Sequence, residues 1–130
     1  MKFKTNRNVV YNCQYHVVWC VKYRKKLLTG DIETRLKEIL LDVATEIETE
    51  IVEMETDKDH IHLLISCDPQ FGIHKVVKRM KGRSSRLLRS EFGILRSRLS
   101  SLWTNSYFVS TVGGASLEVI KQYIKDQQKV

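Results

Sequence analysis

The sequence predicts an α+β fold in which an antiparallel sheet is covered on one face by two helices. Two observations carry this prediction. Segments in which apolar and polar residues alternate, as in half-buried strands, are interleaved with segments of helical periodicity. These segments follow the order βαββαβ, which is the ferredoxin-like or RRM-like arrangement. A further helical segment comes last, so the 130 residues are predicted to form a single domain with an additional C-terminal helix.

The N-terminal third is predicted to hold the first strand and the first helix. Alternation from Val9 to Lys22 places most apolar side chains on one side, which predicts a long strand with one apolar face. A basic stretch and a turn at Thr29-Gly30 follow. Asp31 is expected to cap the next helix, in which apolar residues recur at helical spacing as far as Ile47.

Two strands joined by a short polar turn form a predicted hairpin. They span Ile51–Thr56 and His60–Ser66, and Asp57-Lys58-Asp59 connects them. We expect both aspartates to cap this turn rather than to bind a metal ion. A second helix is expected from Ile73, with apolar residues along one face and basic residues along the other.

The C-terminal part is predicted to hold a fourth strand and a separate helix. The strand is Tyr107–Thr111, and it follows a segment that is irregular or briefly helical. Gly113-Gly114 is expected to form a flexible joint, and Ser116 to cap a last helix that runs to about Gln127. Because this helix hangs on the joint, it need not pack on its own sheet. The predicted division is a body of residues 1–112, the joint, and a helix of residues 115–130.

The composition favours a cytoplasmic protein without a membrane partner. No apolar run approaches the roughly 20 residues of a membrane span, and the N-terminus lacks the apolar region of a signal peptide. The spacing of Cys13, Cys20 and Cys67 suits neither a disulfide framework nor a zinc site. All three are therefore expected to be buried, reduced thiols.

Positive charge is concentrated in two separate segments. The net charge is +7, and residues 72–99 carry nine basic residues but a single acidic one. Residues 1–26 add seven basic residues and no acidic one. Such surfaces favour nucleic acid as a partner, although a solvated helix face explains the charge equally well. The candidate DNA contacts are Tyr23, Arg24, Lys25, Lys78, Arg79, Lys81, Arg83 and Arg86.

His60 and His62 are the most informative pair in the chain. Side chains two residues apart on a strand leave the same face, so the two imidazoles can share one metal ion. Two neutral imidazoles alone make an open site, which substrate oxygens can enter. An ordinary half-exposed strand would show the same pattern, so the pair alone leaves both interpretations open.

Tyr123 and Gln127 are four residues apart, on one face of the last predicted helix. A tyrosine in such a position most often serves packing, and its phenol is a weak nucleophile unless a metal ion polarises the phosphate. The amide oxygen of Gln127 suits a hard divalent cation. With the histidine pair, these residues are consistent with a metal-assisted phosphoryl-transfer site.

Six blocks of sequence carry a resemblance to a known family, and they are specific as an ordered set rather than singly. With them the chain resembles the single-tyrosine HUH (His-hydrophobe-His) transposases of the smallest bacterial and archaeal insertion sequences, the TnpA-type transposases. The resemblance covers nearly the whole chain. The blocks are Tyr15–Arg24, Asp59–Leu64, Met80–Ser85, Leu102–Phe108, Val112–Ser116 and Tyr123–Gln127.

The resemblance implies that Tyr123 is the nucleophile, and that His60, His62 and Gln127 hold a divalent metal, Mg²⁺ or Mn²⁺. It implies cleavage of single-stranded DNA through a 5′-phosphotyrosine link, with rejoining by a free 3′-hydroxyl. It also implies a homodimer that recognises DNA hairpins near the ends of the element. In such a dimer the tyrosine helix of one protomer can complete the histidine site of the other.

Two other functions remain open at this stage. One is a domesticated HUH nuclease that processes palindromic chromosomal repeats. The other is a ferredoxin-like nucleic-acid-binding module without catalysis. An RNA-recognition motif of that kind would carry an aromatic signature on its central strands, and the histidine strand lacks it.

Overall fold

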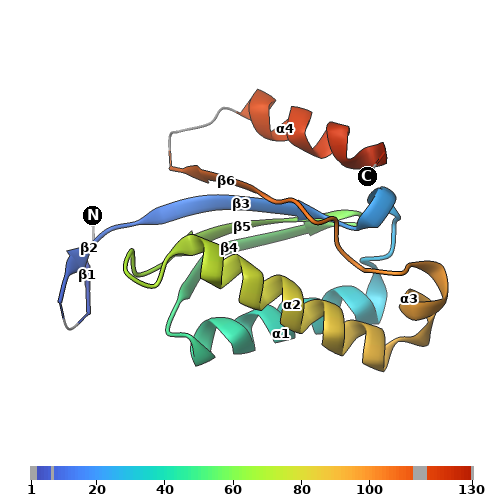
Figure 1. Cartoon of the computed structure of the whole chain (residues 1–130), viewed down its shortest axis with the longest axis horizontal. Helices are drawn as coiled ribbons and strands as arrows, with labels where there is room; N and C mark the ends of the chain where they lie inside the picture. The colour runs from blue at the N-terminus through green and yellow to red at the C-terminus, as the bar shows by residue number, and fades with distance from the viewer. Residues whose placement is uncertain (1–2, 7, 113–116, 130) are drawn as a thin grey trace.

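The computed structural model describes residues 3–6, 8–112 and 117–129, and a four-stranded sheet forms its body (Figure 1). The strand order is β4-β5-β3-β6, and every neighbouring pair runs antiparallel. The predicted α+β class and the predicted hairpin are confirmed. The strands are β3 (Gln14–Cys20), β4 (Glu50–Asp57), β5 (His60–Ser66) and β6 (Phe108–Thr111).

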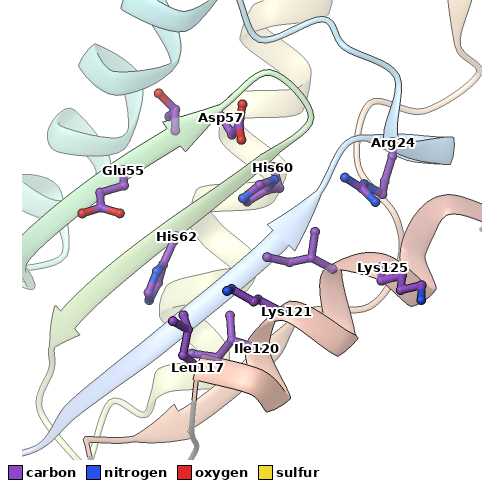
Figure 2. Close-up of a pocket in the computed structure, with 11 residues that line it drawn as sticks. Arg24, Glu55, Asp57, His60, His62, Leu117, Ile120, Lys121 and Lys125 are labelled. Atoms are coloured by element: carbon purple, nitrogen blue, oxygen red, sulfur yellow. The ribbon is translucent and has the colours of Figure 1, made fainter.

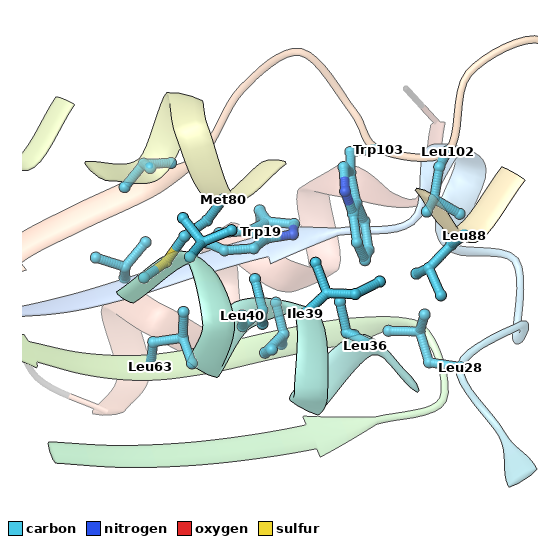
Figure 3. Close-up of a cluster of buried hydrophobic side chains, with 14 of the residues drawn as sticks. Trp19, Leu28, Leu36, Ile39, Leu40, Leu63, Met80, Leu88, Leu102 and Trp103 are labelled. Carbon is cyan, nitrogen blue, oxygen red and sulfur yellow. The ribbon is translucent and has the colours of Figure 1, made fainter. Parts of the chain in front are cut away.

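Two long helices cover one face of this sheet (Figure 1). Their apolar residues, spaced at helical intervals, meet the alternate strand residues that point toward them. Trp19, Leu63 and Met80 are fully buried at this contact (Figure 3). Burial of such large apolar side chains is the main favourable term in folding. The helices are α1 (Gly30–Glu46) and α2 (Ile73–Glu91), and a short helix α3 (Gly93–Arg98) follows.

The N-terminal strand is shorter than the sequence predicts. The segment from Val9 is divided: β2 (Val10–Tyr11) pairs with β1 (Lys4–Thr5) in a separate hairpin, and β3 begins only at Gln14. The side chain of Asn6 closes the hairpin by accepting the N–H groups of Asn8 and Val9 at 2.7 and 2.8 Å. The alternation of apolar and polar residues continues through the break between β2 and β3. The sequence pattern therefore could not reveal where the strand is interrupted.

The last helix lies across the other face of the sheet, opposite α1 and α2 (Figure 1). It comprises α4 (Leu117–Asp126) and a terminal 3₁₀ turn, η2 (Gln127–Lys129). In this structure the helix packs on its own sheet: Ile120 is buried, and the ring centroids of Tyr123 and Phe108 are 5.6 Å apart. Both faces of β3 are therefore covered, which is why Val18 and Cys20 are as fully buried as Trp19.

Several smaller expectations have mixed outcomes. Cys20 and Cys67 are buried as expected, whereas Cys13, just before β3, is only half-buried. The Gly113-Gly114 joint and the Ser116 cap lie outside the described residues. No helix within the described ranges has both the length and the apolar character needed to cross a membrane.

Candidate active site

His60 and His62 leave the same face of β5, the one that α1 and α2 do not cover. The residues between and after them, Ile61, Leu63 and Ile65, are fully buried in the core on the other face. The strand thus places the two imidazoles side by side, as its alternation predicts. A cavity of about 470 Å³ opens beside them (Figure 2).

Asp59 orients the first histidine. Its Oδ1 lies 2.7 Å from His60 Nδ1, and because a carboxylate only accepts, Nδ1 carries the proton. Its Oδ2 accepts from Arg24 at 3.1 Å from Nε and 2.9 Å from the terminal nitrogen. Burial acts to raise the pKa of Asp59, but the hydrogen bond from His60 and the charge of Arg24 outweigh it and leave the pKa below its usual value. His60 therefore presents Nε2, its remaining nitrogen, for metal binding.

The expectation that both turn aspartates act as caps is half right. Asp57 Oδ1 does accept the backbone N–H of Lys58, at 2.7 Å. Asp59 instead is buried to 6% exposure between Arg24 and His60. Proximity in sequence to the histidine could have suggested this role, but the partner Arg24, 35 residues earlier, could not be foreseen.

Replacing Asp59 by Asn is expected to lower the affinity for Mn²⁺ by about 10- to 100-fold, the usual effect of removing a group that orients a metal-binding histidine. Isothermal titration of the purified protein with Mn²⁺ measures this directly. Asp42→Asn is the matched control, since it removes the same charge from an exposed position on α1, on the other side of the sheet from His60. Equal affinities for the wild type and Asp59→Asn would contradict the orienting role.

His62 has a different environment. Its Nε2 lies 3.1 Å from Nδ1 of His16, on the neighbouring strand β3. Burial, together with the nearby His16, lowers the pKa of His62 and favours the neutral form, which is the form that binds metals. A metal ion bound through Nε2 would replace the contact with His16. The sequence alone gave no reason to single out His16 as this neighbour.

The wall of the cavity that faces the histidines comes from α4. Ile120 and Ile124 contribute apolar surface, and Lys121 and Lys125 contribute positive charge (Figure 2). Cationic groups facing a potential metal site suit a phosphate group. The remaining lining residues are Arg24, Glu55, Thr56, Asp57 and Leu117.

Tyr123 and Gln127 do not line this cavity; both are docked on Ser106, in the loop before β6. Ser106 Oγ donates to Gln127 Oε1 at 3.1 Å and lies 2.8 Å from the Tyr123 hydroxyl. Because a serine hydroxyl has one proton, Tyr123 is then the donor in the second bond. Burial raises the pKa of Tyr123, so in this position the phenol is held in its protonated form.

The structure thus brings the predicted residues together in two pairs rather than in one site. His60 and His62 share one cavity, and Tyr123 and Gln127 share Ser106. Within the described ranges no three His, Cys, Asp or Glu side chains are arranged to hold a metal ion. A metal ion at the histidine pair would therefore need a third ligand of another type, or one that arrives after a movement of α4.

The candidate DNA contacts fall into two regions. Tyr23 and Lys25 are exposed in and just after the short 3₁₀ turn η1 (Lys22–Arg24), whose Arg24 is paired with Asp59 and lines the histidine cavity. The exposed residues of α2 line a groove on the helix layer, on the other side of the sheet from the histidines. They are Lys78, Arg79 and Arg86; the half-buried Arg83, which is paired with Glu46, lines the same groove.

Lys81 does not belong to this exposed face. Its Nζ donates to the backbone carbonyls of Thr104 at 2.7 Å and Ser106 at 3.0 Å, and burial lowers its pKa to about 8. Lys81 therefore fixes the loop that carries Ser106. The helical spacing suggested a surface cation, because it could not show that this loop folds over α2.

The fold, with its His-x-His strand and a separate tyrosine-bearing helix, is that of a transposase. The family model described as "Transposase IS200 like" matches residues 9–127, and the chain belongs to this family. The ISDra2 transposase TnpA of Deinococcus radiodurans is 39% identical over 98% of this chain and 92% of its own length. The transposase for insertion sequence element IS200 of Salmonella typhimurium is 33% identical over 90% of this chain and 78% of its own length.

Two solved structures share the fold. A protein from Deinococcus radiodurans R1, solved as a candidate transposase, superimposes with a TM-score of 0.85 at 37% identity and covers 98% of this chain and 99% of its own. A REP-associated tyrosine transposase bound to a REP hairpin superimposes with a TM-score of 0.61 over 93% of this chain and 67% of its own. At 11% identity, the second likeness concerns the fold alone.

Proposed function

We propose that this protein is a metal-dependent tyrosine transposase that cleaves and rejoins single-stranded DNA at the ends of an insertion sequence. The observation that carries the proposal is the combination of two histidines, in a cavity that also presents Arg24, Lys121 and Lys125, with a tyrosine and a glutamine on the last helix. Its α4 part forms the cavity wall and its η2 turn carries the glutamine. The identity of 39% with the ISDra2 transposase over almost the whole chain supports the same conclusion.

In the proposed reaction, the Tyr123 hydroxyl oxygen attacks a DNA phosphorus. A bond from phosphorus to the tyrosine oxygen forms while the bond to the 3′-oxygen breaks, so the strand ends in a free 3′-hydroxyl and the 5′-phosphate stays on the protein. The phenol proton leaves and the 3′-oxygen takes up a proton. Attack of a 3′-hydroxyl on such a link reverses the exchange and rejoins strands without an external energy source.

The side chains present fit a divalent metal ion, Mg²⁺ or Mn²⁺. His60 has Nε2 available because Asp59 holds Nδ1, and His62 is kept neutral by burial. The amide oxygen of Gln127 would supply the third ligand once α4 has moved. When bound, the metal would polarise the phosphate and stabilise the charge that develops on its oxygens.

The docked position of α4 supports a resting state that must rearrange before reaction. Tyr123 and Gln127 would have to leave Ser106 together and enter a histidine cavity. We propose that the protein acts as a homodimer, in which this cavity can be that of the partner protomer. Because Tyr123 in α4 and Gln127 at the start of η2 both bond Ser106 from the same side of the last helix, a single displacement of that helix would deliver both.

The proposed substrate is single-stranded DNA that carries hairpins. A protein of the same fold was solved bound to a REP hairpin, which supports a hairpin as ligand. That protein also supports, at the level of fold, the alternative of a domesticated nuclease acting on palindromic repeats. The much higher identity to transposases of insertion sequences favours transposition.

The experiment that tests the proposal is an assay for covalent protein–DNA adducts on a denaturing gel. Labelled single-stranded hairpin DNA from the flanks of the gene is incubated with the protein and with Mg²⁺ or Mn²⁺. A metal-dependent adduct is the expected result. Tight binding without any adduct would favour the non-catalytic module instead.

Replacing Ser106 by Ala is expected to accelerate the first round of adduct formation. The change removes the bonds that hold Tyr123 and Gln127 in the docked position, and two such bonds contribute on the order of 1–2 kcal/mol, or about 5- to 30-fold in the docking equilibrium. The initial rate of adduct formation measures the effect. Ser97→Ala is the control, because it removes a hydroxyl whose bond in the described part of the chain goes to Ile94 O, away from the last helix. A slower reaction would show that Ser106 assists the chemical step rather than opposing it.

A further inference from the structure

A second cavity of about 520 Å³ lies on the other side of the η1 turn from the histidines. The turn contributes to both: Arg24 lines the histidine cavity, whereas Lys22 and Tyr23 line the second one. The end of α4 forms one wall through Asp126 and Gln127. The opposite wall belongs to the body and comes from Thr104, Asn105 and Ser106.

The η1 turn holds an aromatic ring in solvent at this cavity. Tyr23 is 52% exposed, and both Tyr23 and Arg24 have left-handed backbone conformations, with φ of 57° and 52°. Such conformations are unfavourable for residues other than glycine and persist only where the surroundings impose them. Here the Lys22 N–H bonds to Leu102 O at 2.8 Å, and the Arg24 side chain is anchored on Asp59. These contacts hold η1 in a strained conformation, and in that conformation the Tyr23 ring is exposed.

The neighbouring groups suit a nucleobase. The Lys22 ammonium lies 5.3 Å from the centre of the Tyr23 ring, where it can also meet a phosphate. Asn105 is exposed, and among the described residues its side-chain amide has no hydrogen-bond partner. Its backbone is held, because Lys81 donates to the carbonyls of residues 104–106. An amide with both a donor and an acceptor is thereby presented on a fixed loop.

We propose that this cavity binds one unpaired nucleobase of the DNA strand next to the cleaved phosphate, by stacking on Tyr23 and hydrogen bonding to Asn105. The inference rests on the proposed function, since it places the strand across η1 from the histidine cavity. Stacking on an aromatic ring suits any base, and the amide of Asn105 adds selectivity for the base edge. Tyr23 and Asn105 both belong to the body, so the ring and the amide stay in place when α4 leaves its docked position, and only the wall of Asp126 and Gln127 is lost.

The test is a binding cycle in the Tyr123→Phe background, in which DNA is not consumed. Hairpin oligonucleotides from the flanks of the gene carry an abasic site at each unpaired position in turn, and dissociation constants are measured for each. At one position the abasic site is expected to weaken binding by about 5- to 150-fold, the range for one stacked base. Tyr23→Ala should weaken binding of intact DNA by a similar factor and make the protein insensitive to the abasic site there. Tyr23→Phe should keep the wild-type pattern, and Phe3→Ala, which removes another exposed ring, should not change it.

The outcomes separate this inference from the proposed function. Independent, additive effects of Tyr23→Ala and of every abasic site would overturn the base site, even if the protein with Tyr123 intact forms covalent adducts. Failure of the protein to form adducts at all would overturn the proposed function. The base site is supported if, at one position, the losses of affinity caused by Tyr23→Ala and by the abasic site are not additive. Asn105→Ala should then reduce discrimination among bases at that same position.

Discussion

Replacing Tyr123 by Phe is expected to abolish covalent attachment to DNA completely, because the change removes the only atom that would attack the phosphate. The fold should tolerate it. The ring centroids of Tyr123 and Phe108 are 5.6 Å apart, a contact that Phe retains, and among the described residues the lost hydroxyl bonds only Ser106. The denaturing-gel adduct assay measures attachment, and a filter-binding or gel-shift assay measures DNA affinity, which should stay within a few-fold of the wild type.

Tyr107→Phe is the matched control for this prediction. Tyr107 lies just before β6 and its hydroxyl bonds His74 at 2.7 Å, so the variant loses the same atom from a neighbouring position outside both cavities. It should form adducts at the wild-type rate. Adducts formed by Tyr123→Phe would show that another side chain is the nucleophile. If the protein were a non-catalytic module, Tyr123→Phe would leave every activity unchanged.

His60→Ala and His62→Ala should each reduce adduct formation by roughly a thousandfold or more. Loss of one imidazole leaves too few ligands for the metal, whose stabilisation of the charged phosphate contributes several kcal/mol. Both side chains lie on the face of β5 that points away from α1 and α2, so the buried core beneath them, including Ile61, should be unaffected. Initial rates at several Mn²⁺ concentrations measure the loss.

The control for the histidine variants is His74→Ala. His74 is exposed at the start of α2 and contacts Tyr107 rather than the cavity. Its replacement should leave both the rate and the Mn²⁺ dependence unchanged. Full activity of His60→Ala or His62→Ala would contradict a metal site at this pair.

Most of the fold was predictable because it depends on local patterns. The alternation in β5 and the helical spacing in α1 and α2 each specify which side chains are buried. The N-terminal break at Asn12-Cys13 was not predictable, since the alternating pattern of apolar residues runs on from Val10 into β3 while the chain leaves the sheet. The position of α4 was also unpredictable, because residues that cover a second sheet face, such as Ile120, look the same in sequence as those of any amphipathic helix.

The candidate site was predictable in its parts but not in its arrangement. The spacing of His60 and His62 specifies a common face, and that of Tyr123 and Gln127 specifies another. The separation of the two pairs depends on Ser106, which lies 17 residues from Tyr123. Ser106 belongs to the Leu102–Phe108 block of the resemblance, but nothing in that block indicates that its hydroxyl bonds Tyr123 and Gln127. Long-range contacts of single polar groups are determined by the packing of the whole chain, and no local pattern reports them.

The most direct test of the central claim is to identify the residue that carries the DNA. The covalent adduct is denatured, digested with nuclease and trypsin, and analysed by tandem mass spectrometry. Trypsin cuts after Lys121 and Lys125, so Tyr123 is expected in the short peptide Gln122–Lys125 with a nucleotide phosphate on its side chain. A nucleotide attached to any other residue would contradict the assignment of Tyr123 as the nucleophile.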